Sequence, residues 1–115
     1  MYEQYMKIAI DEAKKGIACG EQPYGAVLVA DGKVVAVAHN EVLSSKNNIN
    51  HAEIVAITKY LNTMTTKPKD LTLITTCEPC VNCFGTAIKL GVNRFVYGSD
   101  LETAISYGSN DIHLG

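Results

Sequence analysis

Two short segments of this 115-residue chain carry side chains that could share a metal ion. His51 lies two residues before Glu53, and Cys80 lies three residues before Cys83. Cysteines at this spacing on a helix place both sulfurs on one side of its first turn, where the helix dipole favours thiolates. Two thiolates and one imidazole are typical zinc ligands, and they leave a fourth tetrahedral position for water. The pattern therefore predicts an open, reactive zinc site.

Glu53 is the candidate proton carrier of this site, because a carboxylate next to the ligand segment can reach the water without filling the coordination sphere. Two alternatives stay open from the residues alone. Cys77 could join Cys80, Cys83 and His51 in a closed structural site, or the two spaced cysteines could form a redox pair. We favour the open site, since a closed one would leave Glu53 without a purpose.

Separate helices must deliver the two segments to one place. Apolar residues recur every three or four positions near the N-terminus, which predicts an amphipathic helix. Asp31-Gly32 between two β-rich runs predicts an antiparallel hairpin, and the polar residues 40–50 predict a loop. The predicted elements are a helix from 2 to between 16 and 20, strands at 24–30 and 33–39, a helix at 51–61, a strand at 71–76, a helix at 80–90 and a strand at 94–97. This order predicts an α/β fold, a sandwich with helices covering both faces of a mixed sheet.

The composition limits the classes of protein to consider. An apolar content of 47% suits one domain with a substantial core, and a net charge of -2 offers no general attraction to a polynucleotide. No segment approaches the roughly 18 apolar residues of a membrane span. We therefore expect a soluble, cytoplasmic protein without a membrane partner. Cys19 lies apart from the other cysteines, and we interpret it as a packing residue or a free thiol.

The segments His51-Ala52-Glu53 and Pro79-Cys80-Val81-Asn82-Cys83 match the H-x-E and P-C-x-x-C signature of zinc deaminases. From about Tyr2 to Asp111 the chain resembles the cytidine-deaminase-like superfamily. Pro23-Tyr24-Gly25-Ala26-Val27 and Asn40 are similar to the branch of guanine deaminases and bacterial tRNA adenosine deaminases. This resemblance implies a three-layer α-β-α sandwich with a five-stranded sheet, a zinc active site and a homodimer. It also implies that Asn40 and the backbone amide of Ala52 contact the bound base.

In such a site water attacks the carbon that carries the amino group, Glu53 moves the protons, and ammonia leaves. The run 75–80, Thr-Thr-Cys-Glu-Pro-Cys, resembles guanine deaminases more than tRNA deaminases, and Asp111 falls where guanine enzymes carry an acidic residue. We therefore expect deamination of a small nucleobase or nucleoside, most simply a purine such as guanine. Adenosine in tRNA, cytosine or cytidine, and a noncatalytic structural zinc domain are the alternatives.

Three departures from the family pattern concern the substrate pocket. Residues 47–50, Asn-Asn-Ile-Asn, replace the usual Asp-Pro-Thr-Ala, and Asn82 replaces the usual Met. The sequence ends at Gly115, where relatives usually continue. We therefore expect one domain over residues 1–115 with a C-terminal tail shorter than that of the family, and a pocket that differs in detail.

Overall fold

The structure, a computed structural model of the chain, describes residues 2–64, 66–77 and 79–98. Every predicted helix and strand is present with closely similar bounds, and one short helix is added. The elements are α1 (Glu3–Ala18), β1 (Gly25–Ala30), β2 (Lys33–His39), α2 (Val42–Ser45), α3 (Ala52–Thr63), β3 (Leu71–Thr75), α4 (Val81–Lys89) and β4 (Arg94–Tyr97). Asp111 and the C-terminal end of the predicted domain lie outside the described residues.

The four described strands form one mixed sheet in the order β2-β1-β3-β4. β1 pairs antiparallel with both β2 and β3, whereas β4 runs parallel to β3. At the predicted hairpin turn Asp31 and Gly32 have φ angles of 49° and 84°, as the tight primed turn of a two-residue hairpin requires. The mixed sheet confirms the predicted class, and the fifth strand is not seen in the part of the chain that the structure describes.

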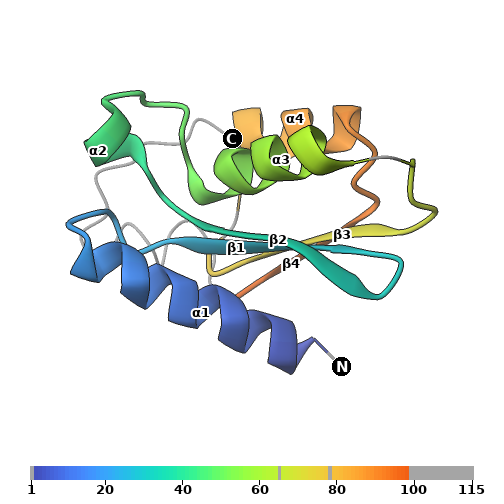
Figure 1. Cartoon of the computed structure of the whole chain (residues 1–115), viewed down its shortest axis with the longest axis horizontal. Helices are drawn as coiled ribbons and strands as arrows, with labels where there is room; N and C mark the ends of the chain where they lie inside the picture. Colours follow the sequence, from blue (N-terminus) through green and yellow to red (C-terminus); the bar gives the residue numbers. More distant parts are fainter. Residues whose placement is uncertain (1, 65, 78, 99–115) are drawn as a thin grey trace.

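Helices cover the two faces of the sheet, with α1 on one face and α3 and α4 on the other (Figure 1). The alternation along β1 determines this arrangement, because successive side chains of a strand point to opposite faces. Leu28 packs in the core cluster that contains Ala56 of α3 and Ala87 of α4. Val27 packs instead with Ala9 of α1. The predicted three-layer sandwich is therefore confirmed. No helix of the described residues is long and apolar enough to cross a membrane.

Helix α1 lies very close to the sheet at Gly25, the first residue of β1. A Cβ atom placed on Gly25 would overlap the carbonyl oxygen of Ala9 and lie 2.9 Å from the backbone nitrogen of Ala13. Gly25 is also tied to the end of β3, since its N–H donates to Thr76 Oγ1 at 3.2 Å and its carbonyl accepts from Thr76 N at 3.0 Å. The absence of a side chain therefore allows helix and sheet to meet here.

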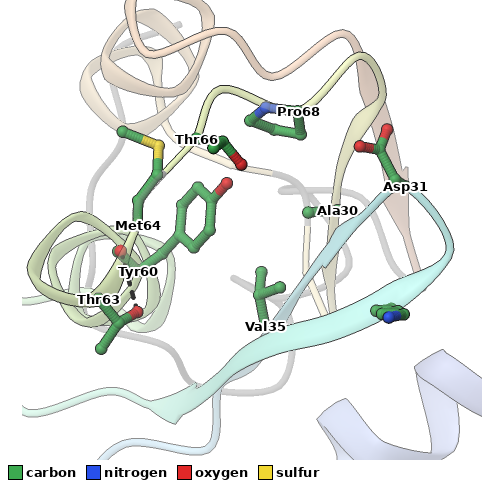
Figure 2. A pocket seen from close by; sticks show the side chains of 9 residues that line it. Ala30, Asp31, Val35, Tyr60, Thr63, Met64, Thr66 and Pro68 are labelled. Carbon is green, nitrogen blue, oxygen red and sulfur yellow. Dashed lines mark hydrogen bonds between the residues drawn. The ribbon is translucent and has the colours of Figure 1, made fainter.

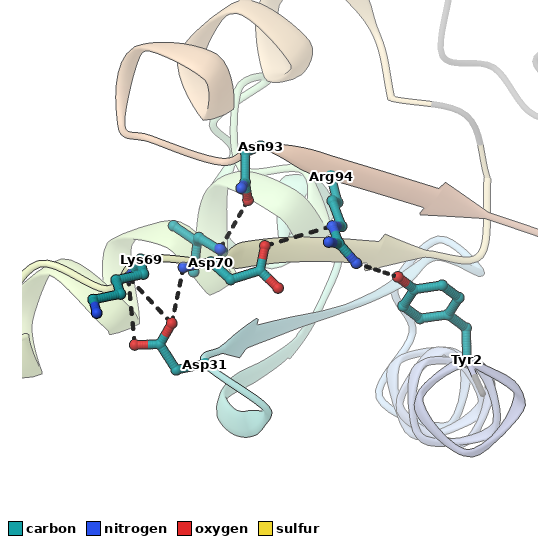
Figure 3. Close-up of polar contacts among 7 residues, drawn as sticks. Tyr2, Asp31, Lys69, Asp70, Asn93 and Arg94 are labelled. Carbon is teal, nitrogen blue, oxygen red and sulfur yellow. Dashed lines mark hydrogen bonds and ion pairs between the residues drawn. The ribbon is translucent and has the colours of Figure 1, made fainter.

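At the hairpin end of the sheet, polar side chains hold neighbouring turns together (Figure 3). The Asp31 carboxylate accepts hydrogen bonds from the backbone N–H groups of Lys69 at 3.1 Å and Asp70 at 2.8 Å. Asp70 in turn lies 3.5 Å from Arg94 Nε, and Arg94 Nη1 donates to the Tyr2 hydroxyl at 3.2 Å. These contacts connect four parts of the chain: the hairpin turn, the segment before β3, strand β4 and the start of α1.

The residues from 40 to 50 differ from the predicted loop, because they contain the short helix α2. Asn40 Oδ1 accepts from the N–H of Val42 at 2.9 Å. The buried Glu21 carboxylate accepts from the N–H groups of Leu43 at 3.2 Å and Ser44 at 3.3 Å. Orphan N–H groups at a helix start need such acceptors. The prediction of a plain loop was wrong because one acceptor comes from a distant segment.

Candidate metal centre and active site

The side chains of His51, Cys80 and Cys83 converge in the structure, and their ligand atoms all lie within 4.8 Å of one another. His51 is the residue immediately before α3, and Cys80 is the residue immediately before α4. Both helices cover the same face of the sheet, so their N-termini can meet although the two segments are far apart in sequence. Cys83 lies in the first turn of α4 and completes the group.

The distances between these atoms suit a zinc ion. The two sulfurs of Cys80 and Cys83 are 3.2 Å apart, and His51 Nδ1 lies 3.7 Å and 3.3 Å from them, respectively. Ordinary zinc–sulfur and zinc–nitrogen bond lengths in a tetrahedron give ligand separations of about 3.5 to 3.8 Å. Shifts of a few tenths of an ångström would therefore bring all three atoms to bonding distance of one ion, so the donor set fits zinc in both chemistry and spacing.

The start of α4 prepares one sulfur to be a thiolate. Cys80 Sγ accepts the backbone N–H of Cys83 at 3.3 Å, which makes it the N-cap acceptor of the helix. The sulfurs of Cys80 and Cys83 also share a hydrogen bond, and this contact is the main cause that lowers the pKa of the Cys80 thiol. The same contact, together with burial, raises the pKa of Cys83. Bound metal needs deprotonated thiols, so a contact that favours the thiolate form of one sulfur suits this pair to a cation.

Glu53 lies in the first turn of α3, beside the three candidate ligands, and its side chain is only 7% exposed. Burial raises the pKa of this carboxyl, although a backbone hydrogen bond and the nearby His51 and Cys83 act in the opposite direction. A carboxyl that can hold its proton to a higher pH than an exposed glutamate is suited to accept and return protons near neutrality.

Cys77 does not belong to this group. The Thr75 hydroxyl donates to its backbone carbonyl at the end of β3. Among the described residues, the set of histidine, cysteine and acidic side chains placed to hold a metal consists of His51, Cys80 and Cys83. This geometry argues against the closed four-ligand alternative. Cys19 is exposed at the C-terminal end of α1 and is not in this group.

Asn40 follows β2 on the face of the sheet that carries the metal group. Ala38 lies in the core cluster with Ala52, and strand alternation turns Asn40 to the same face. Asn40 is 1% exposed, and its Nδ2 has no hydrogen-bond partner. Ala52 is buried as the first residue of α3, where the helix itself supplies no acceptor for the backbone N–H. Two candidate donors therefore flank the metal group.

Glu21 is the residue of this region that sequence reasoning missed. Its buried carboxylate holds the start of α2 and so orders the segment between Asn40 and His51. A glutamate in a Gly- and Pro-containing loop is typical of an exposed turn, and no local pattern indicates a contact with residues more than 20 positions away. Only the tertiary arrangement shows its role.

A pocket of about 400 Å³ lies elsewhere, between the hairpin, the end of α3 and the segment that follows it (Figure 2). Its lining includes Val35, Tyr60, Met64 and Pro68 but none of the candidate ligands. Tyr60 is nine residues along the chain from His51, or roughly 13 Å at the helical rise. This pocket is therefore separate from the metal group.

Comparisons with known proteins agree with this geometry. The family model for the cytidine and deoxycytidylate deaminase zinc-binding region matches residues 1–99. The chain is 41% identical over 98 residues to a tRNA-specific adenosine deaminase of Bacillus subtilis, a match that covers 84% of this chain and 61% of that protein. It is 32% identical over 112 residues to a guanine deaminase of Bacillus subtilis, covering 96% and 72% of the two chains.

The fold is similar to solved structures of the same kinds of protein. The crystal structure of guanine deaminase from Bacillus subtilis superposes with a TM-score of 0.86 at 32% identity, covering 94% of this chain and 70% of that one. A tRNA:A34 deaminase structure superposes with a TM-score of 0.79 at 30% identity, covering 85% and 72%. The chain spans less than two thirds of the length of the tRNA-specific adenosine deaminase.

Proposed function

Because the chain belongs to the family of the cytidine and deoxycytidylate deaminase zinc-binding region, we propose that it catalyses hydrolytic deamination of an aminated nucleobase or nucleoside. The observation that carries this proposal is the convergence of His51, Cys80 and Cys83 beside the buried Glu53. One face of the sheet thus offers a metal-binding group and a proton carrier at the same point. A purely structural zinc site has no use for such a carboxyl.

The residues of the site have three roles, which are to bind the metal, to move protons and to orient the base. His51, Cys80 and Cys83 would hold the zinc ion, which when bound would lower the pKa of water and so supply a nucleophile near neutral pH. Glu53 accepts the two protons of the attacking water one after the other and passes one to the ring nitrogen and the other to the departing amine. Water adds to the carbon that bears the amino group, the carbon–nitrogen bond breaks, and ammonia and a carbonyl product are released. Asn40 Nδ2 and the Ala52 N–H orient the base.

Guanine, or a closely related amino-oxo purine, is the substrate that we propose. The similarity to guanine deaminase extends over 94% of the chain with a TM-score of 0.86, and a net charge of -2 gives no general attraction to a polyanion. Adenosine in tRNA is the second candidate, favoured by the 41% identity to a tRNA-specific adenosine deaminase. Recognition of the purine amide edge by Asp111, the role that the resemblance to guanine deaminases implies, belongs to this proposal, although the residue lies outside the described part of the chain.

Ammonia release from a panel of substrates tests both candidates. The zinc-loaded protein is supplied with guanine, guanosine, adenine, cytosine, cytidine or a tRNA with adenosine at position 34. Glu53→Gln is the inactive control. We expect release from guanine to exceed that from every other compound. Release only from the tRNA would replace guanine by adenosine in tRNA, and zinc-loaded protein inactive on the whole panel would contradict the proposed deaminase activity.

A homodimer is part of the proposal. Val81, Phe84 and Ile88 recur along α4 at helical spacing, and all three remain exposed in the single chain. An exposed apolar stripe of this kind is typical of a surface that a partner covers. Light scattering on the purified protein should give twice the mass of one chain, and a monomer at micromolar concentration would contradict the dimer.

A further inference from the structure

Two buried polar atoms of the described residues have no hydrogen-bond partner, and they are chemically complementary. One is the acceptor Gln22 Oε1, and the other is the donor Asn40 Nδ2. Leaving a buried donor or acceptor unpaired is unfavourable, and such groups in folded proteins are rare. Asn40 already belongs to the proposed substrate site, whereas Gln22 has no role in the mechanism given above.

Backbone hydrogen bonds place Gln22 and Asn40 on one edge of the site. The N–H of Tyr24 donates to the Gln22 carbonyl at 2.9 Å, and the N–H of Asn40 donates to the Tyr24 carbonyl at 3.1 Å. Beyond Asn40, the N–H of Glu41 donates to the carbonyl of Asn50 at 2.9 Å. Asn50 directly precedes His51, so a continuous series of backbone contacts leads from Gln22 to a candidate metal ligand.

The segment that carries Gln22 is held on both sides. Glu21 is buried and bonded to the start of α2, and Pro23 restricts the backbone on the other side. Tyr24 packs against the core cluster on the face of the metal group. The Gln22 side chain is therefore presented from a fixed backbone.

We propose that Gln22 is a specificity-determining residue of the deaminase site, an inference that rests on the proposed function. Its Oε1 accepts a hydrogen bond from an N–H or O–H group of the substrate, while Asn40 Nδ2 donates to an acceptor of the same molecule. The substrate class is a heterocycle, free or carrying a sugar, that offers a donor and an acceptor together. The donor is either an N–H of the base or a hydroxyl of the sugar.

The test uses Gln22→Met, which keeps the length of the side chain but removes the acceptor. Gln4→Met is the matched control, because Gln4 is exposed on α1, outside the proposed site. We expect Gln22→Met to lower kcat/KM on the best substrate about tenfold, mainly through KM, as the loss of a matched polar contact does. Its Tm without substrate should be equal or higher, because an unpaired buried acceptor has been removed. Gln4→Met should change neither quantity.

Substrate analogues identify the donor. If it is a base N–H, methylation of that nitrogen should lower kcat/KM of wild type by the same factor as the substitution Gln22→Met. The methylated analogue should not lower kcat/KM of Gln22→Met any further. If it is a sugar hydroxyl, only nucleosides should respond to the substitution. Equal kcat/KM for wild type and Gln22→Met on every active base and nucleoside would overturn the inference, as would a fall in Tm accompanied by an equal loss on every substrate.

Binding measurements separate this inference from the proposed function. Calorimetry with the same bases and nucleosides is performed on Glu53→Gln and on Glu53→Gln combined with Gln22→Met. Weaker binding by the double variant than by Glu53→Gln supports the role of Gln22. If wild type then releases no ammonia, only the deaminase proposal is rejected. Ammonia release by wild type with equal binding in the two variants would reject the role of Gln22 alone.

Discussion

The two ends of the sheet use polar side chains in opposite ways. At the hairpin end, the Asp31 carboxylate accepts two backbone N–H groups, and Asn93 Oδ1 accepts the N–H of Leu71 at 2.9 Å. At the metal end, Glu53 is buried with a raised pKa, and Asn40 has a buried donor without a partner. Polar groups that bond only the backbone stabilise the fold, whereas a buried carboxyl with a raised pKa and a buried donor without a partner indicate a place for a ligand.

Removing a candidate ligand should produce the largest effect at the metal end. We expect Cys83→Ala to reduce the zinc content from about one ion per chain to nearly none and to abolish ammonia release, since a tetrahedral site loses one of its three protein ligands. Mass spectrometry of the metal content after dialysis measures this. Cys77→Ala is the matched control and should retain its zinc, because Cys77 is not in the converging group. Zinc loss in that control would make Cys77 a ligand.

Glu53→Gln should produce the next largest effect, on turnover and not on the metal. The amide preserves shape but cannot carry a proton, so we expect kcat to fall by a factor of about 10² or more. Steady-state ammonia release at saturating substrate measures the change, together with zinc content and Tm. A variant with near-wild-type kcat would show that another group moves the protons.

At the hairpin end, Asp31→Ala should affect stability and leave the chemistry intact. Loss of the acceptor for Lys69 N and Asp70 N should lower the free energy of unfolding by about 1 to 2 kcal/mol. Asp31→Asn keeps an acceptor and tolerates the positive φ, so it should lose less. Urea unfolding measures both variants. A large fall in kcat/KM with Asp31→Ala would remove the distinction between the two ends.

Arg94→Ala should produce the smallest effect. The guanidinium contacts Asp70 and the Tyr2 hydroxyl, but it lies at the surface, where such pairs contribute little. We expect Tm, zinc content and ammonia release to match wild type within experimental error, as measured in parallel with Asp31→Ala. A loss of stability as large as that of Asp31→Ala would show that this contact is essential for connecting α1 to β4.

Local patterns predicted most of the fold and the convergence of the metal group. Asp31-Gly32 predicted a hairpin because few residue pairs adopt the positive φ angles of its turn. The spacing of Cys80 and Cys83 predicted that both lie on one helical turn. The match of the His51 segment to the zinc-deaminase signature indicated His51 as the third ligand. Such signals lie within a few residues of one another, so they can be read directly from the sequence.

The contacts of Glu21, Gln22 and Asn40 could not be predicted in the same way. Glu21 bonds residues more than 20 positions along the chain, and the unpaired atoms of Gln22 and Asn40 are recognisable only when their surroundings are known. A buried polar group is defined by everything packed against it, and that information is absent from a short segment. The roles assigned to Asn40, Ala52 and Asp111 by family resemblance remain predictions.

The close approach at Gly25 has a consequence for the range of sequences that this fold accepts. Any side chain at that position would collide with the Ala9 carbonyl, which belongs to the rigid backbone of α1 and cannot turn aside. The displacement would also disturb the hydrogen bonds from Gly25 to Thr76, only four residues before Cys80. In a library of random substitutions selected for folded protein, residue 25 should therefore return as glycine, although it bears no chemistry of its own.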